Sequence, residues 1–172
     1  MSQVSSSVGE KVAKIEMLVH RLKEMEGKEK ARESLLGYAK YQMESYLTPP
    51  HIKLLASKLE AVERGEIKRL AIFMPPRHGK SILTSEFFPA WYLGRNPKKF
   101  IICSTYGQEL ADDFGRKVRN QLQDPHYQEL FPDVGLATDS SSMRRFNTSK
   151  GGVYYAVGAG SAITGRGAHL LL

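Results

Sequence analysis

Apolar residues recur every three or four positions in the first third of the chain, a spacing that is typical of amphipathic helices. It predicts helices over Val12–Met25, Ala31–Leu47 and roughly His51–Glu63. The first two could pack as a hairpin through Gly27–Lys30. Because the first helix is rich in lysine and glutamate, a loosely attached or partner-binding arm is the alternative.

Short apolar runs alternate with helical patterns in the middle of the chain. Nearly continuous apolar runs predict buried strands at Ile67–Met74 and Phe100–Ser104, with a helix over Lys80–Leu93 between them. Pro89 should kink or break that helix after its first two turns. A strand, helix, strand succession forms a right-handed crossover in a parallel sheet. We therefore predict an α/β fold with a central, mostly parallel sheet flanked by helices.

The remaining segments continue this pattern. Gln108–Gln123 has the spacing of an amphipathic helix, and Met143–Asn147 and Val153–Val157 look like two paired strands. The glycine-rich stretch Gly158–Gly167 then leads into Ala168–Leu172, which begins as a third buried strand. We expect the chain to stop inside its own sheet.

The most informative segment is the turn between the first predicted strand and its helix, Met74–Ser81. It ends in Gly-Lys-Ser, like phosphate-binding loops of the pattern G-x-x-x-x-G-K-[ST], which join a strand to a helix. Met74 occupies the position of the first glycine, so only the second half of the pattern matches. A chance Gly-Lys-Ser at a helix start is the alternative, because short motifs recur by accident.

Each residue in the second half of such a loop has a defined chemical role. Gly79 lets the backbone approach a phosphate closely, and N–H groups at the helix N-terminus face the anion. Lys80 would reach the β- and γ-phosphates of a nucleotide, and the Ser81 hydroxyl would bind Mg²⁺. The two prolines before Arg77 offer no N–H, so the cradle would come mainly from residues 77 to 81. Arg77 adds a charge within reach of a γ-phosphate, or is a surface arginine paired with a carboxylate.

Composition narrows the class of protein. A chain of 172 residues with 41% hydrophobic content suits one domain with a sizeable core. Cys103 is the only cysteine and cannot form an internal disulfide, and the sequence contains neither a secretory signal nor a membrane-length apolar run. A cytoplasmic protein is therefore the default. The net charge of +7 favours polyanionic partners, although such charges are more often a solvated face.

Several blocks of the sequence together resemble the ATPase domain of the large terminase subunit of tailed phages and prophages. These blocks are Gly65–Ser81, Phe88–Arg95, Ser104–Tyr106 and Ile163–Ala168. The resemblance covers about Ala31–Leu172 and none of the first thirty residues. It implies a P-loop NTPase fold of the ASCE type, with a helical arm over residues 1–30 and a partial ATPase domain over residues 31–172.

The resemblance implies a genome-packaging motor in the cytoplasm of a bacterial host cell. ATP hydrolysis with Mg²⁺ would drive double-stranded DNA into an empty procapsid, and a separate nuclease domain would cut the concatemer. The implied partners are the DNA, the small terminase subunit, the portal protein and further copies of the chain in a ring, with no membrane.

The same resemblance assigns roles to residues. Those implied to hold the nucleotide are Pro76, Arg77, His78, Gly79, Lys80, Ser81, Tyr46 and His51, with Ser81 on the metal. Arg77 and Lys80 would act on the γ-phosphate, and Arg166 would be an arginine finger presented to the neighbouring subunit's nucleotide. A plain loop arginine is the alternative for Arg166. His51 stands where the family often has an adenine-contacting glutamine, and Tyr46 could belong only to the core.

The acidic Walker B pair of the family would follow the strand that begins at Leu170, and the chain stops before it. The acids at hand are on predicted helices with no reason to face a γ-phosphate: Glu86, Glu109, Asp112 and Asp113. We therefore expect weak ATP binding and negligible hydrolysis by this chain alone. A P-loop helicase or translocase is a rival, and so is a non-catalytic prophage remnant or a binding module that docks on the small terminase subunit or portal.

Overall fold

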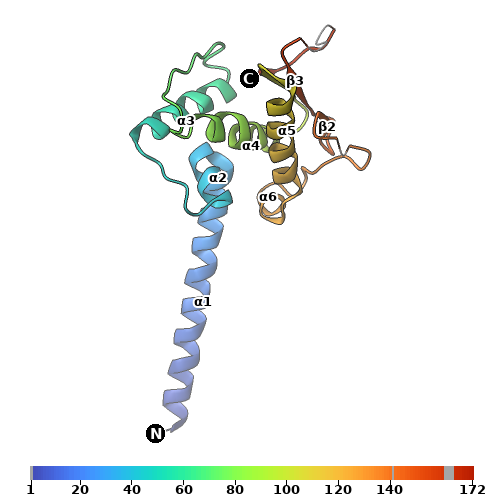
Figure 1. Ribbon diagram of the computed structural model, residues 1–172. Helices are drawn as coiled ribbons and strands as arrows, with labels where there is room; N and C mark the ends of the chain where they lie inside the picture. The colour runs from blue at the N-terminus through green and yellow to red at the C-terminus, as the bar shows by residue number, and fades with distance from the viewer. Residues whose placement is uncertain (1, 141, 161–164) are drawn as a thin grey trace.

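A computed structural model gives the fold and describes residues 2–140, 142–160 and 165–172. A long N-terminal helix extends from an α/β body, and only its C-terminal end is in contact with that body (Figure 1). The C-terminus lies at the far side of the body, beside the sheet (Figure 1).

The first helix, α1 (Ser2–Glu33), corrects the predicted helical hairpin. The chain stays helical through Gly27, although glycine often ends a helix, and no proline follows in Gly27–Lys30 to stop it. It turns instead at Ser34, whose backbone is extended and whose hydroxyl accepts a hydrogen bond from the N–H of Gly37. This N-cap begins α2 (Leu35–Gln42), which is much shorter than the helix predicted up to Leu47.

The third helix, α3 (Pro50–Glu63), forms where the sequence predicts it, with a proline in its first turn. Its Glu60 carboxylate accepts a hydrogen bond of 2.8 Å from the backbone N–H of Leu35 and so joins α3 to the start of α2. The side of α3 that carries Ile52, Leu55 and Leu59 is buried in the core.

The helix after the Gly-Lys-Ser loop is irregular but continuous. It starts at Lys80, passes through a π-helical segment η1 (Ile82–Phe87) and continues as α4 (Phe88–Arg95). Pro89 has no N–H and its ring clashes with the carbonyl of the preceding turn, so the wider π turn accommodates it without the predicted break. The aromatic side chains of this helix are buried in the core, namely Phe87, Phe88, Trp91 and Tyr92.

Four strands form one mixed sheet in the order β2-β3-β1-β4. The strands are β1 (Phe100–Thr105), β2 (Arg145–Asn147), β3 (Val153–Gly158) and β4 (Leu170–Leu171). β1 is parallel to both β3 and β4, with Ile102 opposite Tyr155 on one side and Leu171 on the other. β2 and β3 are antiparallel, which confirms the predicted strand pair.

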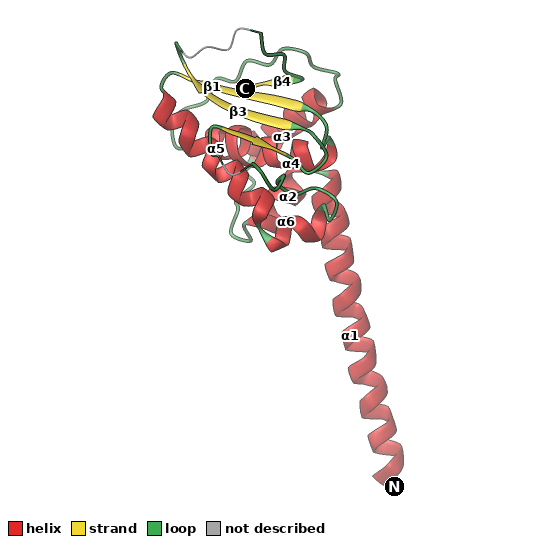
Figure 2. Ribbon diagram, turned by 90° about the vertical axis from the view of Figure 1, so that its right-hand side faces the viewer, coloured by secondary structure: helices red, strands yellow, loops and turns green. Residues whose placement is uncertain are grey.

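The helices cover one face of this sheet (Figure 2). The principal cover is α5 (Gln108–Gln123), which ends where predicted and is followed by the short α6 (Pro125–Leu130). Side chains from both layers form the core, among them Ile101, Tyr154 and Val118, all fully buried. The predicted α/β architecture is therefore present, with the helices mainly on one side of the sheet.

The prediction of a first strand at Ile67–Met74 is wrong. This segment has no strand in the structure, and its Phe73 side chain is 93% exposed. A groove of about 750 Å³ lies between residues 67–72 and β4, so the two backbones form no ladder. The predicted crossover from this segment to β1 is therefore not formed as a pair of sheet strands.

Candidate functional site

The loop that precedes the helix starting at Lys80 has an unusual backbone. The chain turns at Pro76 and Arg77, and Arg77 has a φ of 63°, in the left-handed region that residues with a side chain seldom adopt. Gly79 follows with a φ of 81°, which glycine adopts without strain. Strained positions of this kind persist only where the surrounding structure holds them in place, and they cluster at ligand-binding sites.

Local hydrogen bonds hold this conformation. His78 Nδ1 lies 2.8 Å from the carbonyl oxygen of Pro76. Since a carbonyl can only accept, Nδ1 carries the hydrogen and the other ring nitrogen is left free to accept when the ring is neutral. On the helix side, the Thr84 hydroxyl donates to the carbonyl of Lys80 at 2.8 Å, and the N–H of Leu83 donates to Gly79 at 3.2 Å. The loop is thus fixed at both its turn and its exit.

A pocket of about 360 Å³ opens on this loop. Its lining residues are Pro75, Pro76, Arg77, Gly79, Lys80, Ser81 and Ile82. The structure therefore brings Gly79, Lys80 and Ser81 of the motif together around one cavity at the start of a helix. The positive end of the helix dipole, the Lys80 ammonium and the Arg77 guanidinium give this cavity the electrostatics of an anion site.

The start of α3 packs against the same loop. The rings of His51 and His78 meet edge to face with their centroids 5.9 Å apart. Beneath them, the buried Ile52 side chain approaches so closely that a Cβ on Gly79 would lie 3.0 Å from its Cδ1. The φ of Gly79 favours glycine, and a side chain there would also push the end of Ile52 aside by a few tenths of an ångström. His51 therefore contacts the loop through His78 but does not line the loop pocket.

Tyr46 occupies a different position. It is buried in the core with its ring edge to face against Phe87 at 5.4 Å, and it does not line the loop pocket. Burial raises the pKa of its phenol, and among the described residues its hydroxyl has no hydrogen-bond partner. This placement matches the alternative in which Tyr46 is a core residue.

Arg166 lies on the sheet side of the molecule. It is exposed, and its guanidinium carbon is 4.5 Å from the centre of the Tyr155 ring on β3, against which Arg145 also packs at 5.5 Å. Arg166 does not line the loop pocket. Ser161, Ile163 and Thr164 of the same glycine-rich stretch lie outside the described residues.

Three of the four candidate acids form ion pairs away from the loop, and Glu109 does not line the loop pocket. Glu86 accepts a hydrogen bond from Lys117 at 2.7 Å, Asp112 pairs with Arg144, and Asp113 pairs with Arg116 on the same helix. Among the residues that the structure describes, no acidic side chain lines the loop pocket. Within the part of the chain that the structure describes, no cluster of three or more histidine, cysteine, aspartate or glutamate side chains could hold a metal ion.

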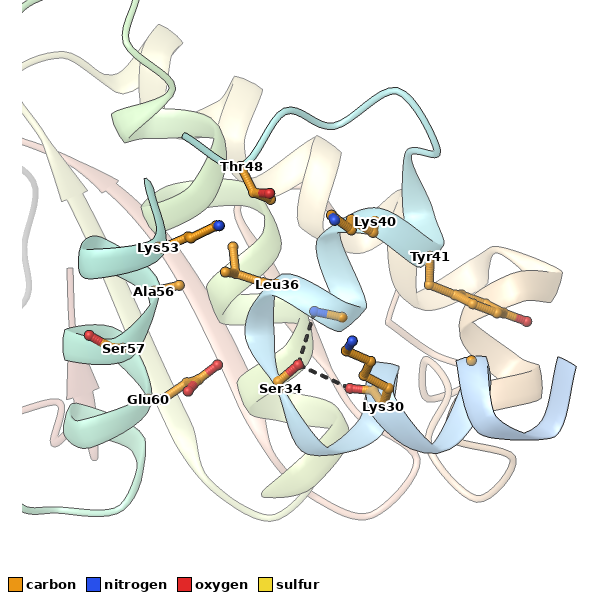
Figure 3. A pocket seen from close by; sticks show the side chains of 12 residues that line it. Lys30, Ser34, Leu36, Lys40, Tyr41, Thr48, Lys53, Ala56, Ser57 and Glu60 are labelled. Atoms are coloured by element: carbon orange, nitrogen blue, oxygen red, sulfur yellow. Dashed lines mark hydrogen bonds between the residues drawn. The ribbon is translucent and has the colours of Figure 1, made fainter. Parts of the chain in front are cut away.

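A second pocket, of about 530 Å³, lies where α1, α2 and α3 meet (Figure 3). The ammonium groups of Lys30, Lys40 and Lys53 surround it, whereas Ser34 and Glu60 in its wall already bond the backbone at the start of α2. Sequence reasoning did not find it, because these lysines lie on three helices and no spacing along the chain connects them. The hydrogen bonds of Ser34 and Glu60 in its wall therefore stabilise the junction of the helices.

The structure thus defines an α/β protein with a strained Gly-Lys-Ser loop at the head of a helix. Residues 71–172, more than half of the chain, match the family model described as "Terminase large subunit, T4likevirus-type, N-terminal". The chain belongs to this family of large terminase subunits, and its role is in phage DNA packaging, with DNA and the packaging machinery as its partners.

The matched region includes the loop, the sheet and Arg166, and it excludes α1, α2 and α3. No curated protein and no solved structure matches the chain. Among the described residues, no helix is both long enough and apolar enough to cross a membrane.

Proposed function

We propose that the loop Met74–Ser81 binds the phosphates of ATP and that this domain is the P-loop ATPase part of a DNA-packaging motor. The observation that carries the proposal is the pocket shared by Gly79, Lys80 and Ser81 at a helix start, on a loop held in a strained conformation. Lys80 contributes a charge to the β- and γ-phosphates and Ser81 a hydroxyl ligand to Mg²⁺. Arg77 adds a second charge at the turn.

In this proposal the nucleotide is shared between subunits. Arg166 is exposed and away from its own loop pocket, a position compatible with reaching the nucleotide of a neighbouring copy. Binding and hydrolysis of ATP in such an assembly would move double-stranded DNA into the procapsid at the portal, with the small terminase subunit as a further partner. The membership of the large terminase family supports this assignment.

Binding of a fluorescent ATP analogue, with and without Mg²⁺, tests the site. We expect Lys80→Ala to weaken binding at least about ten-fold, since it removes the charge that faces the phosphates. Lys99→Ala removes an exposed lysine that does not line the pocket and should leave binding unchanged. Equal affinity of wild type and Lys80→Ala would refute the phosphate site. Affinity retained in His51→Ala would show that His51 contributes little to nucleotide binding.

Phosphate release tests the chemistry separately. No acidic side chain lines the loop pocket, so we expect negligible turnover by the 172-residue chain even at saturating ATP. Turnover that disappears in Lys80→Ala would show that a general base outside this pocket reaches the nucleotide.

A further inference from the structure

The exposed part of α1 carries an apolar face that nothing in the molecule covers. Between residues 11 and 26 the helix stands clear of the body in both views (Figures 1 and 2). Its large apolar side chains are each 44 to 63% exposed, namely Val12, Ile15, Met17, Leu18, Val19, Leu22 and Met25. All but Met17 fall on one side of the helix, because they recur every three or four residues.

This face is directed away from the body. Ala31, which is fully buried against the body, comes nine residues after Leu22, about two and a half helical turns, and so lies on the opposite side of the helix. Lys28, which pairs with Glu129 of α6, is on that body-facing side as well. Two copies could therefore bring their apolar faces together while their bodies stay on the outside of the pair.

The spacing is that of a coiled-coil seam. Val12 and Val19 fall on a positions and Ile15 and Leu22 on d positions of a heptad, and the β-branched a residues with Leu at one d are typical of parallel two-stranded coiled coils. Glu26 occupies the next a position, where two copies would repel each other, so the seam ends before the helix meets the body.

Charge complements this register. In a parallel pair, Lys11 at a g position faces Glu16 at the e position of the other helix, once on each side of the seam. Both side chains are exposed and available for that contact. The binding partner that fits the apolar face of α1 is therefore the α1 helix of a second copy of the chain.

We propose that two copies of this chain associate through a parallel coiled coil of their α1 helices, with Val12, Ile15, Val19 and Leu22 as its core. The contact is isologous, so it pairs chains two at a time. It does not depend on nucleotide, and its failure would leave the proposed ATP site untouched.

Sedimentation equilibrium of the full chain at tens of micromolar tests the pairing. Wild type should sediment with twice the 19.3 kDa mass of one chain. Ile15→Asp should weaken the dimer at least about 100-fold, because it places a charge in the seam. Met17→Asp is the matched control, since Met17 is as exposed as Ile15 but lies on the other side of the helix.

A monomeric wild type would overturn the proposal and leave the face to a different protein. A trimeric mass would overturn the two-stranded arrangement, and equal weakening by Met17→Asp and Ile15→Asp would overturn the assigned seam. Size-exclusion elution without aggregates should confirm that the α/β body stays folded in both variants, because neither side chain packs in its core.

Cross-linking tests the orientation. Mild oxidation of Leu22→Cys should give a covalent dimer in a parallel pair, whereas Met17→Cys should give none. Cys103 does not compete, because it is only 2% exposed and burial raises the pKa of its thiol. A cross-link formed only when Ile15→Cys and Val19→Cys chains are mixed would show an antiparallel pair, in which a and d positions face each other, and would overturn the parallel one.

Discussion

Residues 67–74 and 100–105 are two short apolar runs, each followed by a turn and a helix, yet only the second is a strand. β1 has a hydrogen-bonded neighbour on both sides, and Ile101 is completely buried between them and the helices. Residues 67–72 instead face a groove, and Phe73 is almost fully in solvent. An apolar run becomes a strand only where another backbone satisfies its N–H and C=O groups.

The largest expected effect is the loss of stability when an isoleucine is truncated in β1, compared with the same change in residues 67–74. Ile101→Ala should lower the free energy of unfolding by about 2–5 kcal/mol, because it leaves a cavity in the close-packed core. Ile72→Ala, at a half-buried position beside the groove, should cost at most about half of that. Urea unfolding followed by circular dichroism measures both. Equal losses would mean that residues 67–74 are as firmly packed as β1.

The next effect concerns the loop that follows the unpaired segment. Gly79→Ala should destabilise the protein by about 1–2 kcal/mol, since it combines a φ of 81° with a close contact to Ile52. Arg77→Gly should raise stability by up to about 1 kcal/mol, because glycine relieves the strain at φ 63°. Thermal unfolding of the two variants gives the comparison. A destabilised Arg77→Gly would show that the arginine side chain contributes more than its backbone strain costs.

The smallest effect lies at the beginning of the unpaired segment. The Arg64 guanidinium, hydrogen-bonded to Glu66 at 2.7 Å, holds the pKa of that carboxyl below its ordinary value. A lowered folded-state pKa means that the pair adds stability above the ordinary pKa and that this contribution is lost as pH falls through the folded-state value. In Arg64→Ala, an NMR titration should find the pKa of Glu66 higher than in wild type. An unchanged pKa would show that solvent screens the pair completely.

Local patterns in the sequence predicted those elements correctly whose boundaries and pairing are set by residues close to them in the chain. Asp124-Pro125 ends α5 where predicted, and Met143–Asn147 with Val153–Val157 predicts the antiparallel pair. The hairpin prediction failed because the helix continues through Gly27, with no proline in Gly27–Lys30 to stop it, and the chain turns only at Ser34, which caps the start of α2. Residues 67–74 were misassigned because strand formation depends on a neighbour that apolar spacing cannot specify.

The candidate site was predictable in part. Gly79, Lys80 and Ser81 are adjacent in sequence, so their meeting around one pocket follows from the turn itself. The ring contact between His51 and His78 depends on how α3 packs across the loop, and the resemblance anticipated only that these segments are near each other. The positive φ of Arg77 had no signal at all, because arginine does not favour that conformation.

The attachment of α1 has a mechanical consequence. The carbonyl of Arg32, in the last turn of α1, accepts hydrogen bonds from Trp91 Nε1 at 3.1 Å and from Arg95 at 3.2 Å, both on the helix that starts at Lys80. A helix of 32 residues is about 48 Å long at roughly 1.5 Å per residue. A tilt of about 5° at this anchor would displace the far tip by about 4 Å. The helix α1 therefore acts as a lever, and these two hydrogen bonds attach its C-terminal end to the helix that follows the loop.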